Sequence, residues 1–362
     1  MPVPAGMKAA EASAPEKGGG TKTLVPFLRA TGRHVEPAFD VSFTPGSSSV
    51  NLGPFDVPAH GFIRSVLLWV QGSGGALGGG TADPDMPWNV LKEVSLQDTN
   101  GYPVVHPLSG FQLFLANLYG GYRGFPNPAG VEGFDGSINM NFFLRLPVEI
   151  TPWDGFGALS NQSASSPFRV SLIGAALGDL VSGGTPTAPT VRIRAFLEAY
   201  DPVAETDMLG NPQETAPPGH GTTQYWSVTT PSVSAQRQQV RHTRVGNLIR
   251  NLIYVFRDTN GARSATVEPD EFTLTWDSRL VISNKPTAVH KAEMSEAFGF
   301  SAPAGVLVLP FTDDQDGTAG YENRHLWIPT VESTRLEFEG TFGAAGVMEI
   351  ITNDVGVTAL GR

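Results

Sequence analysis

The histidines are the residues of this chain with the chemistry to bind a transition metal, because the chain contains seven of them and no cysteine. No two form an H-x-H or H-x-x-x-H pair, the local spacing that aims two imidazoles at one ion. The spacing therefore predicts no metal site and no cofactor. His106 and His290 each lie at the start of a predicted helical segment, which favours structural hydrogen bonds for both. The seven are His34, His60, His106, His220, His242, His290 and His325.

An acidic run offers a different kind of cation site. Asp313, Asp314 and Asp316 faintly resemble a calcium-binding loop. Thr312 occupies the first ligand position, however, and Asn323 stands where an EF-hand has its bidentate glutamate. The pattern favours a solvated acidic loop, with a structural cation as the alternative.

Carboxylates near predicted strand ends are the remaining candidates for catalysis. A glycoside hydrolase needs two carboxyl groups facing one sugar, but it needs no fixed sequence spacing between them. Surface or sheet-edge positions are the favoured interpretation, and a catalytic pair stays open as the alternative. The residues concerned are Glu149, Asp154, Glu198, Asp201 and Glu337.

One basic cluster could contact an acidic partner, lipid head groups or a genome. It comprises Arg237, Arg241, His242, Arg244 and Arg250. Ion pairs with the acidic remainder of the chain, or with a neighbouring subunit, are the favoured interpretation. The net charge of −11 argues against binding a polyanion, so no sequence-specific nucleic-acid binding is expected.

The composition indicates an all-β protein with a surface poor in charge. Hydrophobic residues make up 40% of the chain and charged residues only 16%. The 42 glycines and 29 prolines supply many turns. No apolar run resembles a signal peptide or a transmembrane helix, so we expect synthesis in a cytoplasm. The absence of cysteine excludes disulfides and thiol nucleophiles.

A duplicated strand indicates that the chain consists of two similar halves. Residues 61–70 (GFIRSVLLWV) match residues 247–256 (NLIRNLIYVF), which places Arg64 opposite Arg250. Both runs are apolar and β-branched, as buried strands are. A buried arginine must be paired, so each should reach a carboxylate or carbonyl groups. We therefore expect structural roles for these two residues.

Each half shows strand-like segments interrupted by one helical pattern. Helices are predicted within 106–119 and 289–298, because apolar residues there recur with helical period or precede a glycine stop. The predicted strands are 41–44, 62–70, 90–96, 139–146, 168–173 and 191–199 in the first half, and 225–229, 248–256, 272–276, 306–309, 334–338 and 347–351 in the second.

These patterns predict two tandem eight-stranded antiparallel jelly rolls, each with a short inserted helix. Residues 1–37 have the composition of an extended or flexible tail, with Arg29 and Arg33 in a short docking segment at its end. Residues 38–202 form the expected first jelly roll and 223–362 the second. The Pro- and Gly-rich residues 203–222 form the linker.

The order of elements, including the segment SGFQLFLANLYGGY at 109–122, resembles the double jelly-roll major capsid proteins of icosahedral viruses with an internal membrane, such as the tectiviruses. The resemblance implies a structural protein, not an enzyme, that assembles as pseudo-hexagonal homotrimers into a virion shell. It also implies minor capsid and vertex proteins as partners, and an N-terminal tail on the inside, near an internal membrane or between neighbouring capsomers. From the residues themselves, Arg29, Arg33, Arg237, Arg241 and Arg244 are candidates for contacts with the inner face or with partners.

Two alternatives remain open. One is a carbohydrate-binding or carbohydrate-active double β-sandwich, which the missing signal peptide opposes. The other is a bicupin, which the missing histidine pair opposes.

Overall fold

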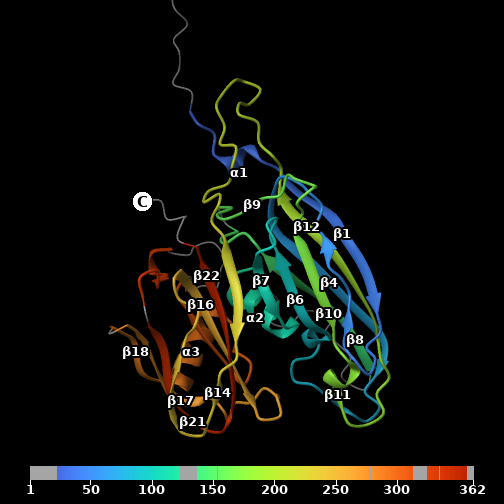
Figure 1. The fold of residues 1–362 in the computed structure, drawn as a ribbon, viewed down its shortest axis with the longest axis vertical. Coiled ribbons are helices and arrows are strands. Elements are labelled where there is room, and N and C mark those ends of the chain that lie inside the picture. The colour runs from blue at the N-terminus through green and yellow to red at the C-terminus, as the bar shows by residue number, and fades with distance from the viewer. Residues whose placement is uncertain are drawn as a thin grey trace, which may run out of the picture.

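The computed structural model describes residues 23–122, 137–152, 154–277, 279–312, 324–333 and 335–356. Two β-sandwich units stand side by side, the first from the blue and green part of the chain and the second from the yellow to red part (Figure 1). Residues 1–22 of the tail and the acidic run at 313–316 lie outside the described residues.

The first unit is a jelly roll built from two antiparallel sheets. One sheet has the order β1-β12-β4-β8, and the other runs β7-β6-β10-β2, with β3 also pairing with β10. The first strand of the unit (β1) pairs with its last (β12), β12 pairs with the third strand (β4), and β4 pairs with the sixth (β8). This is jelly-roll connectivity. The strands are β1 (Arg33–Phe43), β2 (Val50–Asn51), β3 (Phe55–Asp56), β4 (Phe62–Ala76), β6 (Leu91–Gln97), β7 (Pro103–Leu108), β8 (Ser137–Pro147), β10 (Arg169–Gly174) and β12 (Thr190–Tyr200).

The second unit repeats this connectivity. Its sheets have the orders β13-β22-β16-β19 and β15-β21-β17-β18. The all-β double jelly roll predicted from the sequence is therefore confirmed. The strands are β13 (Gln224–Thr229), β15 (Arg237–Arg241), β16 (Leu248–Asp258), β17 (Pro269–Trp276), β18 (Arg279–Pro286), β19 (Val306–Pro310), β21 (Leu336–Phe342) and β22 (Gly346–Val355).

Short strands extend the sheets of both units, and two of them, β5 and β11, form a small sheet of their own. β9 pairs with β4, β11 with β5, β14 with β22 and β20 with β16. Their bounds are β5 (Thr81–Ala82), β9 (Leu159–Ser160), β11 (Val181–Ser182), β14 (Ser232–Val233) and β20 (Ile328–Pro329).

The two units share one sheet. β7 of the first unit pairs in parallel with β13 of the second, where Val105 is opposite Trp226. The joined sheet has eleven strands. The hydrophobic core of the first unit extends into the second, because it includes Trp226, Ile253 and Val308. The units are thus joined by backbone pairing and by a common apolar core.

An inserted helix follows the fifth strand position of each unit. α2 (Gly110–Tyr119) begins with a capping box, in which Ser109 accepts from the Gln112 amide and Gln112 accepts from the Ser109 amide. Every residue of α2 is buried. The sequence predicted an amphipathic helix, but α2 has no exposed face. It contacts β8 and β6 of its own unit and β16 of the other.

The other two helices are more exposed. α3 (Thr287–Phe298) buries only Thr287 and His290. α1 (Phe27–Ala30) is a single turn whose Phe27 packs edge-on against Phe62 and Tyr200.

Several boundaries differ from the sequence expectation. β1 begins at Arg33, so residues 33–37, assigned to the tail, pair with the end of β12. Residues 106–108 belong to β7, because Ser109 caps α2 and fixes its start. β15 and β18 were not expected, since both are edge strands with few buried residues and a weak apolar alternation.

Candidate functional site: the paired arginines and the junction between the units

Arg64 holds a buried carboxylate within the first unit. It lies on β4 and its Nε donates to Glu149 Oε2 at 2.9 Å. The guanidinium also lies 4.8 Å from the centre of the Tyr200 ring, and the Tyr200 hydroxyl donates to Glu149 Oε1 at 2.7 Å. Glu149 is therefore satisfied on both oxygens.

Burial dominates the electrostatics of this cluster. It raises the pKa of Glu149 above its usual range, and the attraction of Arg64 and the Tyr200 hydrogen bond offset only part of the effect. Burial and the neighbouring Glu149 also raise the pKa of Tyr200. These groups form a structural ion pair with its hydrogen-bond donor, a set typical of a buried charge that must be neutralised.

Arg250 occupies the equivalent position on β16 but contacts the other unit. Its guanidinium donates to the carbonyl of Gly120 at 3.0 Å and to Asn353 Oδ1 at 3.2 Å. Gly120 is the C-cap residue of α2, where helix carbonyls need external donors. Arg64 thus stabilises its own unit, whereas Arg250 connects the second unit to the first.

A chain of buried hydrogen bonds joins the two arginine positions. Asn353, the acceptor of Arg250, donates from Nδ2 to Gln224 Oε1 at 3.0 Å. Gln224 in turn donates from Nε2 to the carbonyl of Glu149 at 2.8 Å. The side chain of Glu149 is the partner of Arg64. The repeated strand therefore anchors a polar network that crosses from one jelly roll to the other.

Asp85 forms a second polar contact across the junction. It lies in the first unit and is 4% exposed. Arg257 Nη2 lies 2.7 Å from Asp85 Oδ2, and Arg263 Nε lies 2.9 Å from Asp85 Oδ1. Arg257 also pairs with Glu349, and their contact raises the pKa of the guanidinium. Two arginines of the second unit thus neutralise one buried carboxylate of the first.

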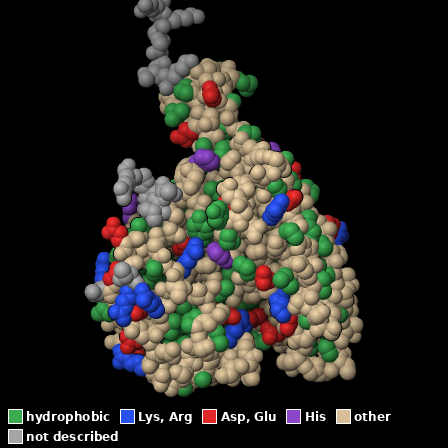
Figure 2. Space-filling model, viewed as in Figure 1, with side chains coloured by type: hydrophobic (Ala, Val, Ile, Leu, Met, Phe, Trp, Pro, Cys, Tyr) green, Lys and Arg blue, Asp and Glu red, His purple; other side chains and the backbone are tan. Residues whose placement is uncertain are grey.

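The basic residues singled out from the sequence do not form one free cluster. Arg237 pairs with Glu339 at 2.5 Å, and Arg244 pairs with Asp354 at 2.8 Å. His242 is buried, which lowers its pKa to about 4. On the face shown in Figure 2, acidic and basic side chains are interspersed. Of the other arginines, Arg29 lies in the turn of α1, Arg33 starts β1 and Arg241 ends β15.

Each of the five candidate catalytic carboxylates pairs with a basic side chain. This is the pattern of structural ion pairs, whereas a glycosidase needs two carboxyl groups facing a shared space. The pairs are Glu149 with Arg64, Asp154 with Arg324, Glu198 with Arg145, Asp201 with His60, and Glu337 with Arg335.

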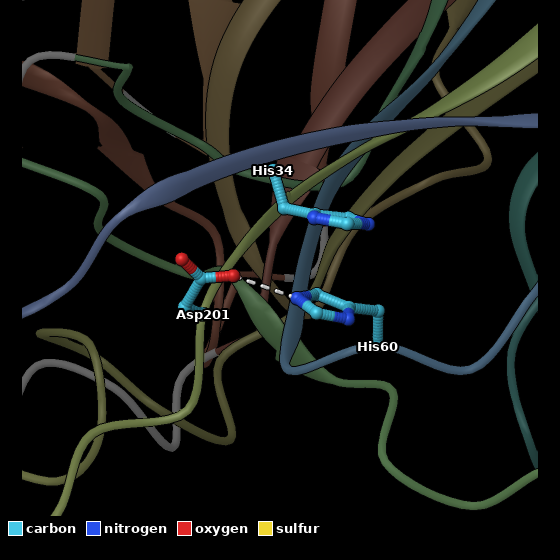
Figure 3. A group of neighbouring side chains, drawn as sticks. All are labelled: His34, His60 and Asp201. Atoms are coloured by element: carbon cyan, nitrogen blue, oxygen red, sulfur yellow. Dashed lines mark hydrogen bonds and ion pairs between the residues drawn. The ribbon is translucent and has the colours of Figure 1, made fainter.

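Two histidines from separate segments of the sequence are neighbours in the structure. The rings of His34 and His60 stack with their centres 3.7 Å apart, beside Asp201 (Figure 3). Local spacing carries no signal for this group, because its members come from three separate segments. His290 instead contacts a backbone carbonyl, that of Val308, at 2.6 Å.

No helix among the described residues is long and apolar enough to cross a membrane.

A hollow of about 700 Å³ lies between the units. Residues of the first unit on one side and of the second unit on the other line it. They include Tyr102, His106, Tyr225, Arg244 and Asn247. The guanidinium of Arg244 lies 5.2 Å from the centre of the Tyr225 ring.

The sequence matches no protein-family model and no curated protein. Its structure matches those of viral capsid proteins over nearly its whole length. The STIV major capsid protein has a TM-score of 0.63 at 12% identity, covering 91% of this chain and 98% of its own. The match to a chain of Sulfolobus Turreted Icosahedral Virus has a TM-score of 0.64 at 12% identity and covers 91% and 92%.

The major capsid protein P2 of bacteriophage PM2 also matches, with a TM-score of 0.52 at 9% identity over 90% of this chain and 97% of its own. The chain has the double jelly-roll fold. The double jelly roll accounts for the repeated strand, because β4 and β16 are the third strand of their respective units.

Proposed function

We propose that this protein is a major capsid protein whose activity is self-assembly into an icosahedral viral shell. The observation that carries the proposal is the repetition of one jelly roll, helix included, in a chain that matches a capsid protein over 91% of its length. The paired carboxylates agree with a structural role and no catalysed reaction. The protein would be made in the host cytoplasm and reside in the virion.

The homotrimer is the assembly unit that this architecture favours. Each subunit contributes two similar units, so three subunits around an axis give a pseudo-hexagonal outline suited to close packing. A rigid junction is needed for this outline, and the polar contacts of Arg250 and Asp85 supply it. Obligate interfaces of this kind bury roughly 2,000–5,000 Å².

The partners follow from the same proposal. Copies of this chain would contact one another within and between trimers, and minor capsid and vertex proteins would fill the remaining positions. Arg29 and Arg33, next to the start of the first unit, are our candidates for contacts at the inner face, where an internal membrane would lie. Arg237 is 71% exposed and, with Arg241 and Arg244, remains a candidate for contacts with a neighbour.

Light scattering of the purified chain tests the proposal. We expect a mass three times the 38.5 kDa of the chain, and hexagonal particles in electron micrographs. A protein that stays monomeric at all concentrations contradicts the proposal.

The hollow between the units favours a second candidate function, carbohydrate binding. Its lining combines the tyrosines Tyr102 and Tyr225 with the polar side chains of His106 and Asn247, and sugars bind to such aromatic and polar surfaces. Saturation-transfer NMR with a panel of monosaccharides tests it. Transfer that disappears in Tyr102→Ala supports sugar binding here, and no transfer from any sugar rejects it.

A further inference from the structure

Three side chains from distant parts of the first unit converge at the start of β1. His34 belongs to β1, His60 lies in the loop before β4, and Asp201 directly follows β12. His60 Nε2 lies 2.7 Å from Asp201 Oδ1. The donor atoms of all three residues lie within 4.8 Å of one another (Figure 3). Two imidazoles and one carboxylate therefore lie close enough together to bind one ion after a small movement of the rings.

The hydrogen bonding of this group is incomplete. His34 Nε2 is buried and has no hydrogen-bond partner among the described residues. The nearest carboxylate oxygen to it is Glu36 Oε2, at 3.5 Å. A buried polar atom without a partner is costly in a folded protein. A ligand bound to the other nitrogen of the ring would make His34 Nε2 a stronger donor to Glu36, as carboxylates do for metal-bound histidines.

The backbone holds Asp201 firmly in place. The Thr31 hydroxyl donates to the Asp201 carbonyl at 2.7 Å, and the Asp201 amide donates to the Gly32 carbonyl at 3.0 Å. A Cβ at position 32 would lie 2.3 Å from Asp201 Oδ2, so a side chain there would push the carboxylate aside. Gly32 therefore lets the carboxylate sit beside His60.

We propose that His34, His60 and Asp201 bind a divalent transition metal, with Zn²⁺ as the ion that fits the ligand set best. Two nitrogens and one oxygen suit zinc, whereas calcium and magnesium prefer oxygen ligands alone. A water molecule would complete a tetrahedral site. The two rings stack with an interplanar angle of 16°, so one must tilt for both nitrogens to aim at the ion.

The metal would fasten the chain at the point where it enters the first jelly roll. It would link β1, the loop before β4 and the end of β12, with Arg29 and Arg33 immediately before it. The proposal does not depend on the capsid assignment, since it concerns the isolated chain.

Calorimetric titration of the full chain with ZnCl₂, after removal of metals with a chelator, tests the site. We expect one ion per chain and an increase in the thermal midpoint, because the ion binds only the folded state. Co²⁺ should give the visible absorption of a tetrahedral site. Zinc should also slow tryptic cleavage after Arg29 and Arg33.

Single substitutions assign the ligands. His34→Ala and His60→Ala should each weaken zinc binding at least about 100-fold, beyond the 10–100-fold typical of residues that only support a ligand. His34→Gln and His60→Gln provide the same test if the alanine variants fold poorly. His106→Ala, on β7, is the matched control and should bind zinc as the unchanged chain does. No stoichiometric binding, or binding unaffected by both ligand substitutions, overturns the proposal.

Discussion

At the scale of single residues, the two halves keep an arginine at the same position of the strand but give it different binding partners. Arg64 and Arg250 occupy the same place in their units, yet the first binds Glu149 and the second binds the end of α2. The difference arises because β16 lies against α2 of the other unit. A buried arginine can thus serve folding in one copy and the joining of copies in the other.

Removal of Arg250 should destabilise the whole chain. Arg250→Ala leaves the Gly120 carbonyl and Asn353 without their donor in a buried place, at a cost of about 3 kcal/mol in the free energy of unfolding. Arg237→Ala is the control, because it removes an exposed ion pair worth less than about 1 kcal/mol. Chemical denaturation measures both, and equal losses contradict the role given to Arg250.

His242 should make the protein sensitive to acid. Burial lowers its pKa from 6.5 to about 4, so the unfolded chain binds the proton more tightly than the folded chain. Stability from this group is present above pH 6.5 and is lost as the pH falls towards 4, by about 3 kcal/mol in total.

The variant His242→Gln isolates this contribution. Gln does not titrate in this range and can still bond to the Tyr254 hydroxyl, the partner of His242 Nε2 at 3.2 Å. Unfolding measured at pH 7.5 and at pH 5 should show a smaller loss for the variant than for the unchanged chain. An identical loss would show that His242 does not govern the acid response.

At the scale of elements, the inserted helices have unlike roles. α2 is buried on all sides and lies between the units, whereas α3 is largely exposed on the second unit. Gln112 shows the coupling directly, because it caps α2 and also donates to Glu349 of the second unit at 2.9 Å. α3 contributes less to the junction, where Phe298 at its end packs edge-on against Tyr119 of α2.

Loss of the α2 cap should be measurable. Ser109→Ala removes the acceptor for the Gln112 amide, a change that costs about 1 kcal/mol at a helix N-terminus. Ser163→Ala is a suitable control, since Ser163 is exposed and its side chain hydrogen-bonds to the Ser165 hydroxyl. Thermal unfolding should separate the two variants, and a neutral Ser109→Ala would mean that the cap is dispensable.

At the scale of the whole molecule, the two jelly rolls are joined because one sheet is continuous across them and the core of the first unit reaches into the second. The shared sheet of eleven strands crosses the junction, and Asp85 accepts two arginines there. Such a body can present two fixed, similar units to its neighbours, which a closely packed shell requires.

Asp85→Asn should loosen the junction. It leaves Arg257 and Arg263 without the charge of their common partner, and breaking a buried ion pair costs about 3–5 kcal/mol. We expect a lower thermal midpoint, faster proteolysis within the linker at 203–222 and fewer trimers. Asp56→Asn, at an exposed ion pair with Arg169, should change none of these. Trimers of normal stability from Asp85→Asn would contradict this role.

The sequence by itself determined the repeated architecture and most of its strands. Alternating and continuous apolar runs are local patterns, and two copies of them in the same order identify a duplicated all-β fold. The matched arginines were identifiable for the same reason, since a charge inside an apolar strand is visible without a structure. The edge strands β15 and β18 were not predicted, because few of their side chains are buried and their apolar pattern is weak.

Only the tertiary structure decided which residues, distant in the sequence, contact one another. Arg250 and Gly120 are 130 residues apart, and His60 and Asp201 are 141 apart. Such contacts depend on how strands cross between sheets, which no local spacing encodes. The burial of α2 on every side, the pairing of each candidate carboxylate and the meeting of His34 with His60 all follow from that long-range packing.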